Sequence, residues 1–151
     1  MIEPKIGTWV LSSLARLIQP VAVTLGLKFF VEGVDREHKD WFRKDSLVLR
    51  VTGPAPRFEA GGQVRYKFEV MVMMTDLEKD SENGFLTPNR MGTLLALLSN
   101  VIPVYDGVVQ VGCLDFDRTA PEPIRVANFG KIDPHTEVVQ SAIVAKYEIT
   151  L

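Results

Sequence analysis

The closing stretch of the chain, Gln140 to Leu151 (QSAIVAKYEITL), alternates apolar and polar side chains. Successive side chains of a β-strand point to opposite faces, so this pattern is typical of a half-buried strand. The sequence predicts a strand over Val138–Leu151 that is an integral part of the sheet. Its apolar set is Ile143, Ala145, Tyr147, Ile149 and Leu151, and the facing set is Val144, Lys146, Glu148 and Thr150.

Two stretches in the middle of the chain show the same alternation, residues 47–52 and 64–72. Between them, Gly53-Pro54-Ala55-Pro56 and Gly61-Gly62 are expected to break a regular ladder. The sequence therefore predicts a long β-hairpin whose tip contains Arg57, Phe58 and Glu59.

Two helices are expected from apolar residues spaced three and four apart. The first follows Gly7, with Thr8 as its cap and Gly26 as its stop, and Pro20 predicts a kink or two consecutive helical pieces. The second starts with Thr87 as its cap and Pro88 in its first turn. Its apolar face comprises Met91, Leu94, Leu95, Leu98 and Val101.

The remaining strands are expected at residues 27–31, 107–116 and 124–129, separated by Gly and Pro turns. No linker divides the chain, so residues 1–151 are predicted to form a single domain. Strands and helices do not alternate regularly. The expected fold class is α+β, with a mainly antiparallel sheet and two principal helices packed on one side.

Composition excludes several classes of protein. A content of 46% hydrophobic and 24% charged residues is ordinary for a globular protein, and a net charge of −2 disfavours general binding to nucleic acid. The apolar stretch Trp9–Phe30 is interrupted by polar residues, so we expect no membrane span. Cys113 is the only cysteine, which excludes an intramolecular disulfide bond.

Candidate catalytic and metal-binding groups each have a simpler structural explanation. Asp115 and Asp117 can share a face of a strand, but a hydrated strand end is the alternative. Cys113 is expected to be a small buried thiol rather than a nucleophile served by His38 or His135. No phosphate-binding glycine motif and no zinc-ligand spacing is present, so we expect no catalysis, no cofactor and no metal.

Two charged segments remain as candidate contact surfaces. The first contains Asp76, Glu78, Asp80 and Glu82, and it is predicted to be an exposed acidic connector, with a weak cation site as the alternative. The second mixes basic and aromatic side chains, as a solvated sheet face or a patch for single-stranded nucleic acid would. Its members are Trp41, Phe42, Arg43, Lys44, Arg50, Arg57, Phe58, Arg65, Tyr66 and Lys67.

The order of predicted elements resembles that of the tail terminator, or tail completion, proteins of tailed bacteriophages. The resemblance covers nearly the whole chain. It is carried by the opening helix Gly7–Gly26, the hairpin Leu47–Thr75, the central helix Thr87–Val101 and the last strand with Gln140-Ser141-Ala142-Ile143-Val144-Ala145-Lys146-Tyr147-Glu148-Ile149.

The resemblance implies a structural protein of the virion tail or neck, present in the host cytoplasm during assembly. It implies a ring, usually a hexamer, that caps the tail tube protein and joins it to a connector or head-completion protein. It implies no catalysis. The expected contact residues are Arg57, Phe58 and Glu59 in the hairpin and Asp76, Glu78, Asp80 and Glu82 in the acidic loop.

The alternative function is a small binding module without catalysis, for single-stranded nucleic acid or as another virion adaptor. Neither function involves a membrane or sequence-specific nucleic acid.

Overall fold

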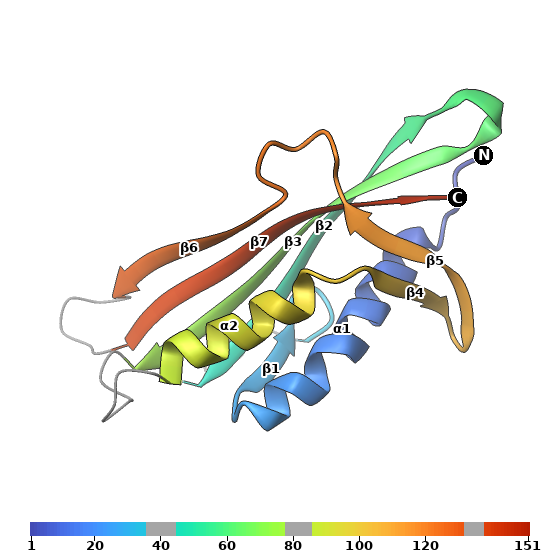
Figure 1. The fold of residues 1–151 in the computed structure, drawn as a ribbon. Coiled ribbons are helices and arrows are strands. Elements are labelled where there is room, and N and C mark those ends of the chain that lie inside the picture. Colours follow the sequence, from blue (N-terminus) through green and yellow to red (C-terminus); the bar gives the residue numbers. More distant parts are fainter. Residues whose placement is uncertain (36–44, 78–85, 132–137) are drawn as a thin grey trace.

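The computed structural model describes residues 1–35, 45–77, 86–131 and 138–151 of the chain. The fold is α+β, with two helices and a mixed, curled sheet of mostly antiparallel strands (Figure 1). The elements in chain order are α1 Ile6–Thr24, β1 Lys28–Val31, β2 Ser46–Phe58, the 3-10 turn η1 Ala60–Gly62, β3 Val64–Leu77, α2 Leu86–Leu98, β4 Ile102–Asp106, β5 Val109–Phe116, β6 Ile124–Lys131 and β7 Val138–Thr150.

The sheet has the strand order β1-β2-β3-β7-β5-β4, and β6 also pairs with β7. Among the strand pairs of the described residues, β1 and β2 alone are parallel, so the sheet is mixed rather than wholly antiparallel. The closing strand β7 lies in the middle and pairs with β3, β5 and β6. The prediction that the chain ends on an integral strand is therefore confirmed.

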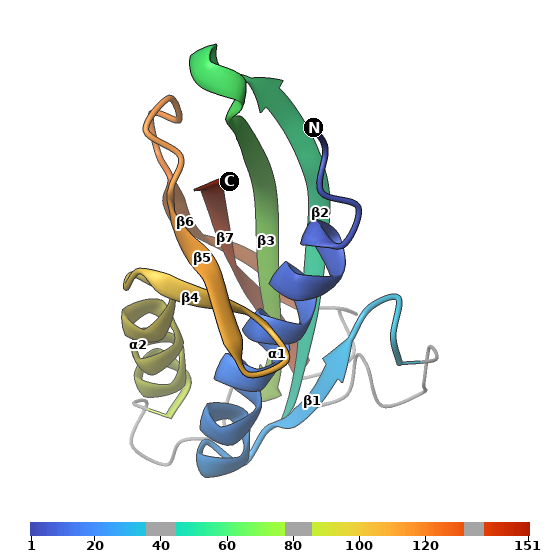
Figure 2. The same ribbon diagram turned by 90° about the vertical axis from the view of Figure 1, so that its right-hand side faces the viewer.

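Both helices pack on the same face of the sheet. Val10, Leu14 and Ile18 of α1 and Leu94 and Leu98 of α2 are buried in one core with the inward-facing strand residues. Figure 2 shows the β4–β5 hairpin lying across α1, where the Arg16 guanidinium stacks over the Tyr105 ring at 4.6 Å. The predicted placement of the helices on one side is correct.

The first helix begins and ends differently from the prediction. It starts at Ile6 after Lys5, which provides no side-chain cap, so Thr8 is not its cap. It continues through Pro20 as one helix rather than two pieces. It does stop at the predicted place, because Gly26 adopts φ +73° and the Leu27 N–H donates to the Ala22 carbonyl at 2.9 Å, closing a Schellman motif.

Helix α1 is also long and apolar enough to cross a membrane by length and composition. In this structure one of its faces is instead buried against the sheet, as the core helix of a globular protein is. Its buried residues are Ile6, Val10, Ser13, Leu14, Ile18 and Ala22.

The second helix begins at Leu86, so Thr87 lies inside it and donates its hydroxyl to Asp76 instead of acting as the cap. It ends at Leu98, and Val101, which was predicted on its apolar face, is 57% exposed. The predicted strand 107–116 is confirmed as β5, but the sequence did not predict β4, which precedes β5 and forms a hairpin with it through a turn at Gly107 with φ +61°. Pro103 lies inside β4.

Part of the sheet is buried on both faces. Val48, Ala142 and Val144 point away from the helix-covered core, yet each is buried. The alternation predicted for residues 47–52 is therefore only partly correct. The alternation of β3 is confirmed, since Val64, Tyr66, Phe68, Val70, Val72 and Met74 are all buried.

Candidate interface on the β2–β3 arm

The far end of the β2–β3 hairpin, residues 55–67, forms an arm that extends beyond the helices (Figure 1). Its turn is closed by the Glu59 N–H, which donates to the Gln63 carbonyl at 2.9 Å. Gly61 and Gly62 have φ values of +81° and +80°, a conformation that glycine adopts without a steric penalty. The Gly61-Gly62 pair thus makes the tight turn that ends the arm.

The predicted hairpin is confirmed, but its tip is shorter than expected. Arg57 and Phe58 lie within β2, opposite Arg65 and Val64 of β3. Of the three residues predicted at the tip, only Glu59 belongs to the turn. The ladder shifts register once, between Thr52 and Ala55, and then resumes. Strand β2 tolerates Pro54 and Pro56 because its outer side is a sheet edge here. No ladder hydrogen bond is lost through the absence of their N–H groups.

Phe58 is the most prominent apolar side chain of the arm and is 68% exposed. Its cross-strand neighbour Val64 is buried, and Val64 also pairs with Leu151 through two backbone hydrogen bonds of 3.0 Å. The β3 side of the arm is therefore paired with the end of the chain up to the residue before the turn, whereas the Phe58 side chain on β2 is exposed. A large exposed apolar side chain beside charged residues is typical of a protein contact surface.

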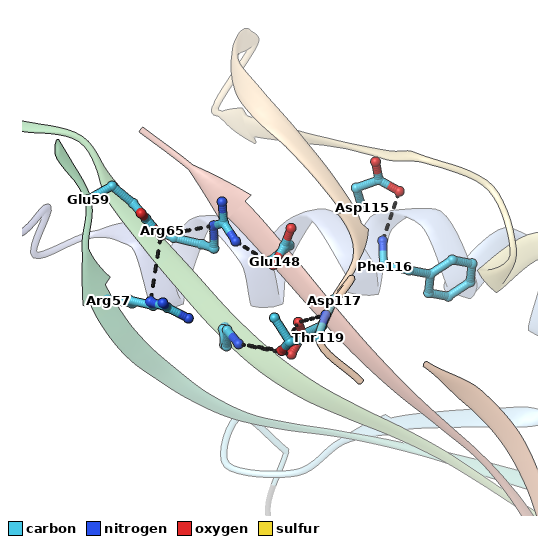
Figure 3. Close-up of polar contacts among 9 residues, drawn as sticks. Arg57, Glu59, Arg65, Asp115, Phe116, Asp117, Thr119 and Glu148 are labelled. Atoms are coloured by element: carbon cyan, nitrogen blue, oxygen red, sulfur yellow. Dashed lines mark hydrogen bonds and ion pairs between the residues drawn. The ribbon is translucent and has the colours of Figure 1, made fainter. Parts of the chain in front are cut away.

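A chain of charges follows the outer face of the arm (Figure 3). Arg57 and Arg65 lie directly opposite one another, an arrangement that repels unless an acid intervenes. The Glu59 Oε1 atom lies 3.7 Å from Arg57 Nε and 3.4 Å from Arg65 Nε. On the other side, Glu148 Oε2 lies 3.7 Å from Arg65 Nη1.

These ion pairs are loosely made. Arg65 Nε and Glu148 Oε2 are buried atoms, and neither has a hydrogen-bond partner within the described ranges. A buried polar group without a hydrogen bond costs free energy. Arg65 of the arm and Glu148 of β7 therefore each have one buried atom whose hydrogen-bonding capacity is not used.

A tighter polar cluster lies next to it, formed by Lys67, Asp117 and Thr119 (Figure 3). The Thr119 hydroxyl and N–H donate to Asp117 Oδ1 at 2.7 and 2.9 Å. Lys67 Nζ donates to Thr119 Oγ1 at 2.8 Å and lies 3.4 Å from Asp117 Oδ2. This cluster ties the β5–β6 connection to β3.

The pKa of Asp117 reflects this environment. Burial by itself favours the protonated form and raises the pKa, but the bonds from Thr119 and the ammonium of Lys67 outweigh it. The net effect lowers the pKa of Asp117, so the carboxylate stays ionised at neutral pH.

A shallow hollow of about 240 Å³ adjoins the Lys67–Asp117 contact. Its charged lining comprises two lysines and two acids, namely Lys67, Lys146, Glu69 and Asp117. Because the positive and negative charges balance, the hollow does not favour a charged ligand of either sign.

Asp76 is not part of an exposed connector, so the prediction of exposure is wrong for this residue. It lies at the end of β3 and is 1% exposed. Its Oδ1 atom accepts a hydrogen bond from Arg90 Nη1 at 3.0 Å, and its Oδ2 atom accepts one from Thr87 at 3.0 Å. The sequence predicted that Asp76 is exposed because it is charged. A buried acid needs a buried basic partner, and the local sequence does not reveal such a partner.

Arg90 is the centre of this buried cluster. It also donates to Asp45 Oδ1 at 2.8 Å and to the Leu25 carbonyl at 3.0 Å, so it joins α2 to β3, to the start of β2 and to the end of α1. Burial disfavours its charge, but Asp45 and Asp76 outweigh that effect and raise the pKa of Arg90. The cluster is a structural clamp.

The other acids predicted to contact a partner, Glu78, Asp80 and Glu82, lie outside the described residues, as do His38 and His135. Asp115 is exposed and accepts a hydrogen bond from the neighbouring Phe116 N–H at 2.8 Å, whereas Asp117 belongs to the Lys67 cluster. Cys113 is exposed, so the prediction of a buried thiol is wrong. Among the described residues, no group of three or more potential ligands can hold a metal ion.

The candidate nucleic-acid patch is dispersed where it can be described. Tyr66 is 1% exposed and its hydroxyl accepts from the Glu3 N–H at 2.8 Å, so its ring is not available for stacking on a base. Arg50 pairs with Glu32 at 2.6 Å. Trp41, Phe42, Arg43 and Lys44 lie outside the described residues.

Sequence reasoning missed that Asp117, Thr119 and Glu148 lie beside the arm. The alternation of β3 and β7 placed Lys67 and Glu148 on polar faces, which was a usable signal. The strand pairing that sets them opposite one another was not predictable from either stretch alone.

Comparison with known proteins adds no assignment. No protein-family model matches the chain, and no curated protein matches its sequence.

Proposed function

We propose that this chain is a structural virion protein of a tailed bacteriophage, a tail terminator or neck subunit. In this role, copies of the chain form a hexamer ring that caps the tail tube and joins it to the connector or head-completion protein. It acts in the virion tail or neck after assembly in the host cytoplasm. The support is the resemblance in element order, together with an α+β fold that combines two helices with a long hairpin.

The observation that carries the proposal is the arm. A ring requires heterologous contacts, in which one surface of a subunit meets a different surface of the next. The arm extends beyond the helices and carries the exposed Phe58 beside Arg57, whose side chain is 60% exposed. Such a projection can reach a neighbouring subunit while its β3 strand stays paired with the end of the chain through Val64 and Leu151.

The interface role is assigned to Arg57, Phe58 and Glu59. Phe58 provides apolar area for burial, and Arg57 provides a charged group at its rim. The Glu59 carboxylate, shared between Arg57 and Arg65, holds the two guanidinium groups in place. Asp76 has no place in this interface, because it is buried in the Arg90 clamp.

The test is a native mass measurement of the purified protein, alone and mixed with tail-tube protein, with electron microscopy of the mixture. The expected result is a ring, alone or on tube ends. Phe58→Asp should abolish the ring, whereas Val108→Asp, on another exposed turn, should not. A chain that neither forms rings nor binds tubes contradicts the proposal, and rings that persist in Phe58→Asp contradict the role of the arm.

A further inference from the structure

Strand β6 lies at an edge of the sheet and, within the described ranges, pairs only with β7. The Lys146 N–H donates to the Pro123 carbonyl at 2.7 Å, and the register places these two residues opposite one another. In an antiparallel pair the backbone groups of successive residues alternate in direction. Arg125 and Ala127 therefore point their backbone groups toward β7, while Ile124, Val126 and Asn128 point theirs outward.

The edge at β1 is closed. The outward N–H of Val31 donates to Asp35 Oδ2 at 2.6 Å. The Val31 carbonyl accepts from the N–H groups of Val34 and Asp35 at 3.2 and 2.8 Å. The turn after β1 thus occupies the groups that a further strand would need.

Two other edges are interrupted as well. On β2, the Glu59–Gln63 bond shows which residues direct their backbone groups toward β3. By the alternation along the strand, residue 56 directs its backbone groups outward, and Pro56 has no N–H to donate there. On β4, the Tyr105 N–H donates to Ser13 Oγ of α1 at 2.9 Å. Proline and covering elements are the usual protection of edge strands.

Strand β6 lacks these protections from Ile124 to Asn128, and its first irregularity is the register shift between Asn128 and Gly130. It also exposes apolar side chains, since Val126 is 48% and Phe129 is 54% exposed. An exposed edge with free backbone groups and apolar side chains is a template for strand addition.

We propose that β6 pairs antiparallel with β6 of a second copy of this chain, extending the sheet across a two-fold axis. Each added strand needs outward backbone groups at alternate positions. Of the described strands β1, β2, β4 and β6, only β6 offers an uninterrupted run of them, so we expect β6 to bind β6 of the second copy. The two-fold contact is isologous and closes on itself, so it is independent of the ring contact proposed for the arm.

Charge selects the register of this pairing. Arg125 is the only charged residue from Ile124 to Asn128. A two-fold axis at Arg125 would set two guanidinium groups opposite one another, which is destabilising. An axis at Val126 instead sets the two Val126 side chains opposite one another, Arg125 opposite Ala127 and Ile124 opposite Asn128, with outward backbone groups aligned.

The first test measures mass by sedimentation. The wild-type chain should sediment at twice its 16.9 kDa mass or at an even multiple of it. Val126→Pro removes one outward N–H but leaves the bonds of Arg125 and Ala127 to β7, so it should halve the mass. Val126→Thr keeps the N–H and should stay paired. A monomeric wild type, or an unchanged mass in folded Val126→Pro, overturns the proposal.

The second test does not depend on the folding of the proline variant. In a Cys113→Ser background, Val126→Cys is treated with diamide, which accepts two electrons and two protons as two thiols form a disulfide bond. Opposed Cα atoms about 5.5 Å apart are within disulfide range. Val126→Cys should form a covalent dimer many-fold faster than Val108→Cys, whose site is 92% exposed. Equal rates would show that the contact is random collision.

Discussion

Arg90 of α2 and Asp76 of β3 form a buried ion pair, with Arg90 Nη1 3.0 Å from Asp76 Oδ1 and the Asp76 side chain 1% exposed. Asp45 is the second acid, and the Leu25 carbonyl accepts a further bond. One side chain therefore connects both helices to the sheet. The Asp76 carboxylate, which was predicted to be exposed, is buried and helps to hold the helices on the sheet.

Removing one acid of this clamp should be costly. Asp76→Ala leaves Arg90 buried with only half of its neutralising charge, so the free energy of unfolding should fall by about 3 kcal/mol or more. Urea denaturation measures this. The control is Glu32→Ala, which breaks the exposed Arg50 pair and should cost at most about 1 kcal/mol. Similar losses in both variants would contradict the clamp.

Asp117 should contribute to acid sensitivity. Its pKa is lowered in the folded state, so its contribution to stability is present above the ordinary carboxyl pKa, about 3.9, and is lost as pH falls toward the folded value. Asp117→Asn should have a lower free energy of unfolding than wild type at pH 7. Between pH 5 and pH 3, the free energy of unfolding should fall less in Asp117→Asn than in wild type. Denaturant midpoints across this range test it. The exposed Asp115→Asn is the matched control, and equal pH profiles for wild type and Asp117→Asn would contradict the assignment.

Tyr147 should support the end of α2. Its buried hydroxyl donates to the Leu98 carbonyl, and burial raises the pKa of the phenol. Tyr147→Phe leaves that carbonyl without its donor, at an expected cost of about 1–3 kcal/mol. Tyr105→Phe is the same chemical change on a half-buried ring and should have a smaller effect. Thermal unfolding of both variants compares them, with equal losses counting against the bond.

Two glycines should respond to alanine with opposite signs. Gly53 has φ +129°, and a Cβ there would lie 2.8 Å from the Lys67 carbonyl oxygen, so Gly53→Ala should destabilise by on the order of 1–3 kcal/mol. Gly92 is helical with open space around it, so Gly92→Ala should stabilise by about 0.5–1 kcal/mol. Chemical denaturation gives both values. A stabilising Gly53→Ala would show that the strand can relax there.

Trimming the closing strand should prevent folding. Removal of residues 147–151 takes away Tyr147 and Ile149 from the core, and it removes the pairing of β7 with β5 and with residues 65–68 of β3. Circular dichroism should then show loss of the cooperative transition. Removal of the exposed Met1 and Ile2 is the control and should preserve it. A cooperative transition in the C-terminal truncation would contradict a central role for β7.

Much of the fold was predictable where a single segment contains its own signal. The alternation of β3 and β7 fits one buried face, and Gly26 and Gly61-Gly62 mark turns that require positive φ. The prediction was wrong where Thr87 resembled a cap. There a tertiary partner, the Asp76 carboxylate, overrides the local preference.

For the candidate interface too, some features were predictable from local sequence and others were not. Local sequence located the arm and the residues Arg57, Phe58 and Glu59, because glycine and proline punctuate its turn. It could not predict that Lys67 meets Asp117, or that Asp76 is buried, because those contacts join residues far apart in the chain. The charge of a residue is visible in sequence, whereas its desolvation depends on which elements pack around it.

By itself, the sequence determined that this is an α+β chain that ends on an amphipathic strand, since periodicity and turn chemistry act over a few residues. Only the tertiary structure decided that this strand lies at the centre, that β1 runs parallel to β2 and that β6 is left as the open edge. The physical reason is that strand pairing and burial depend on long-range contacts, and the local signal in each strand is compatible with several partners.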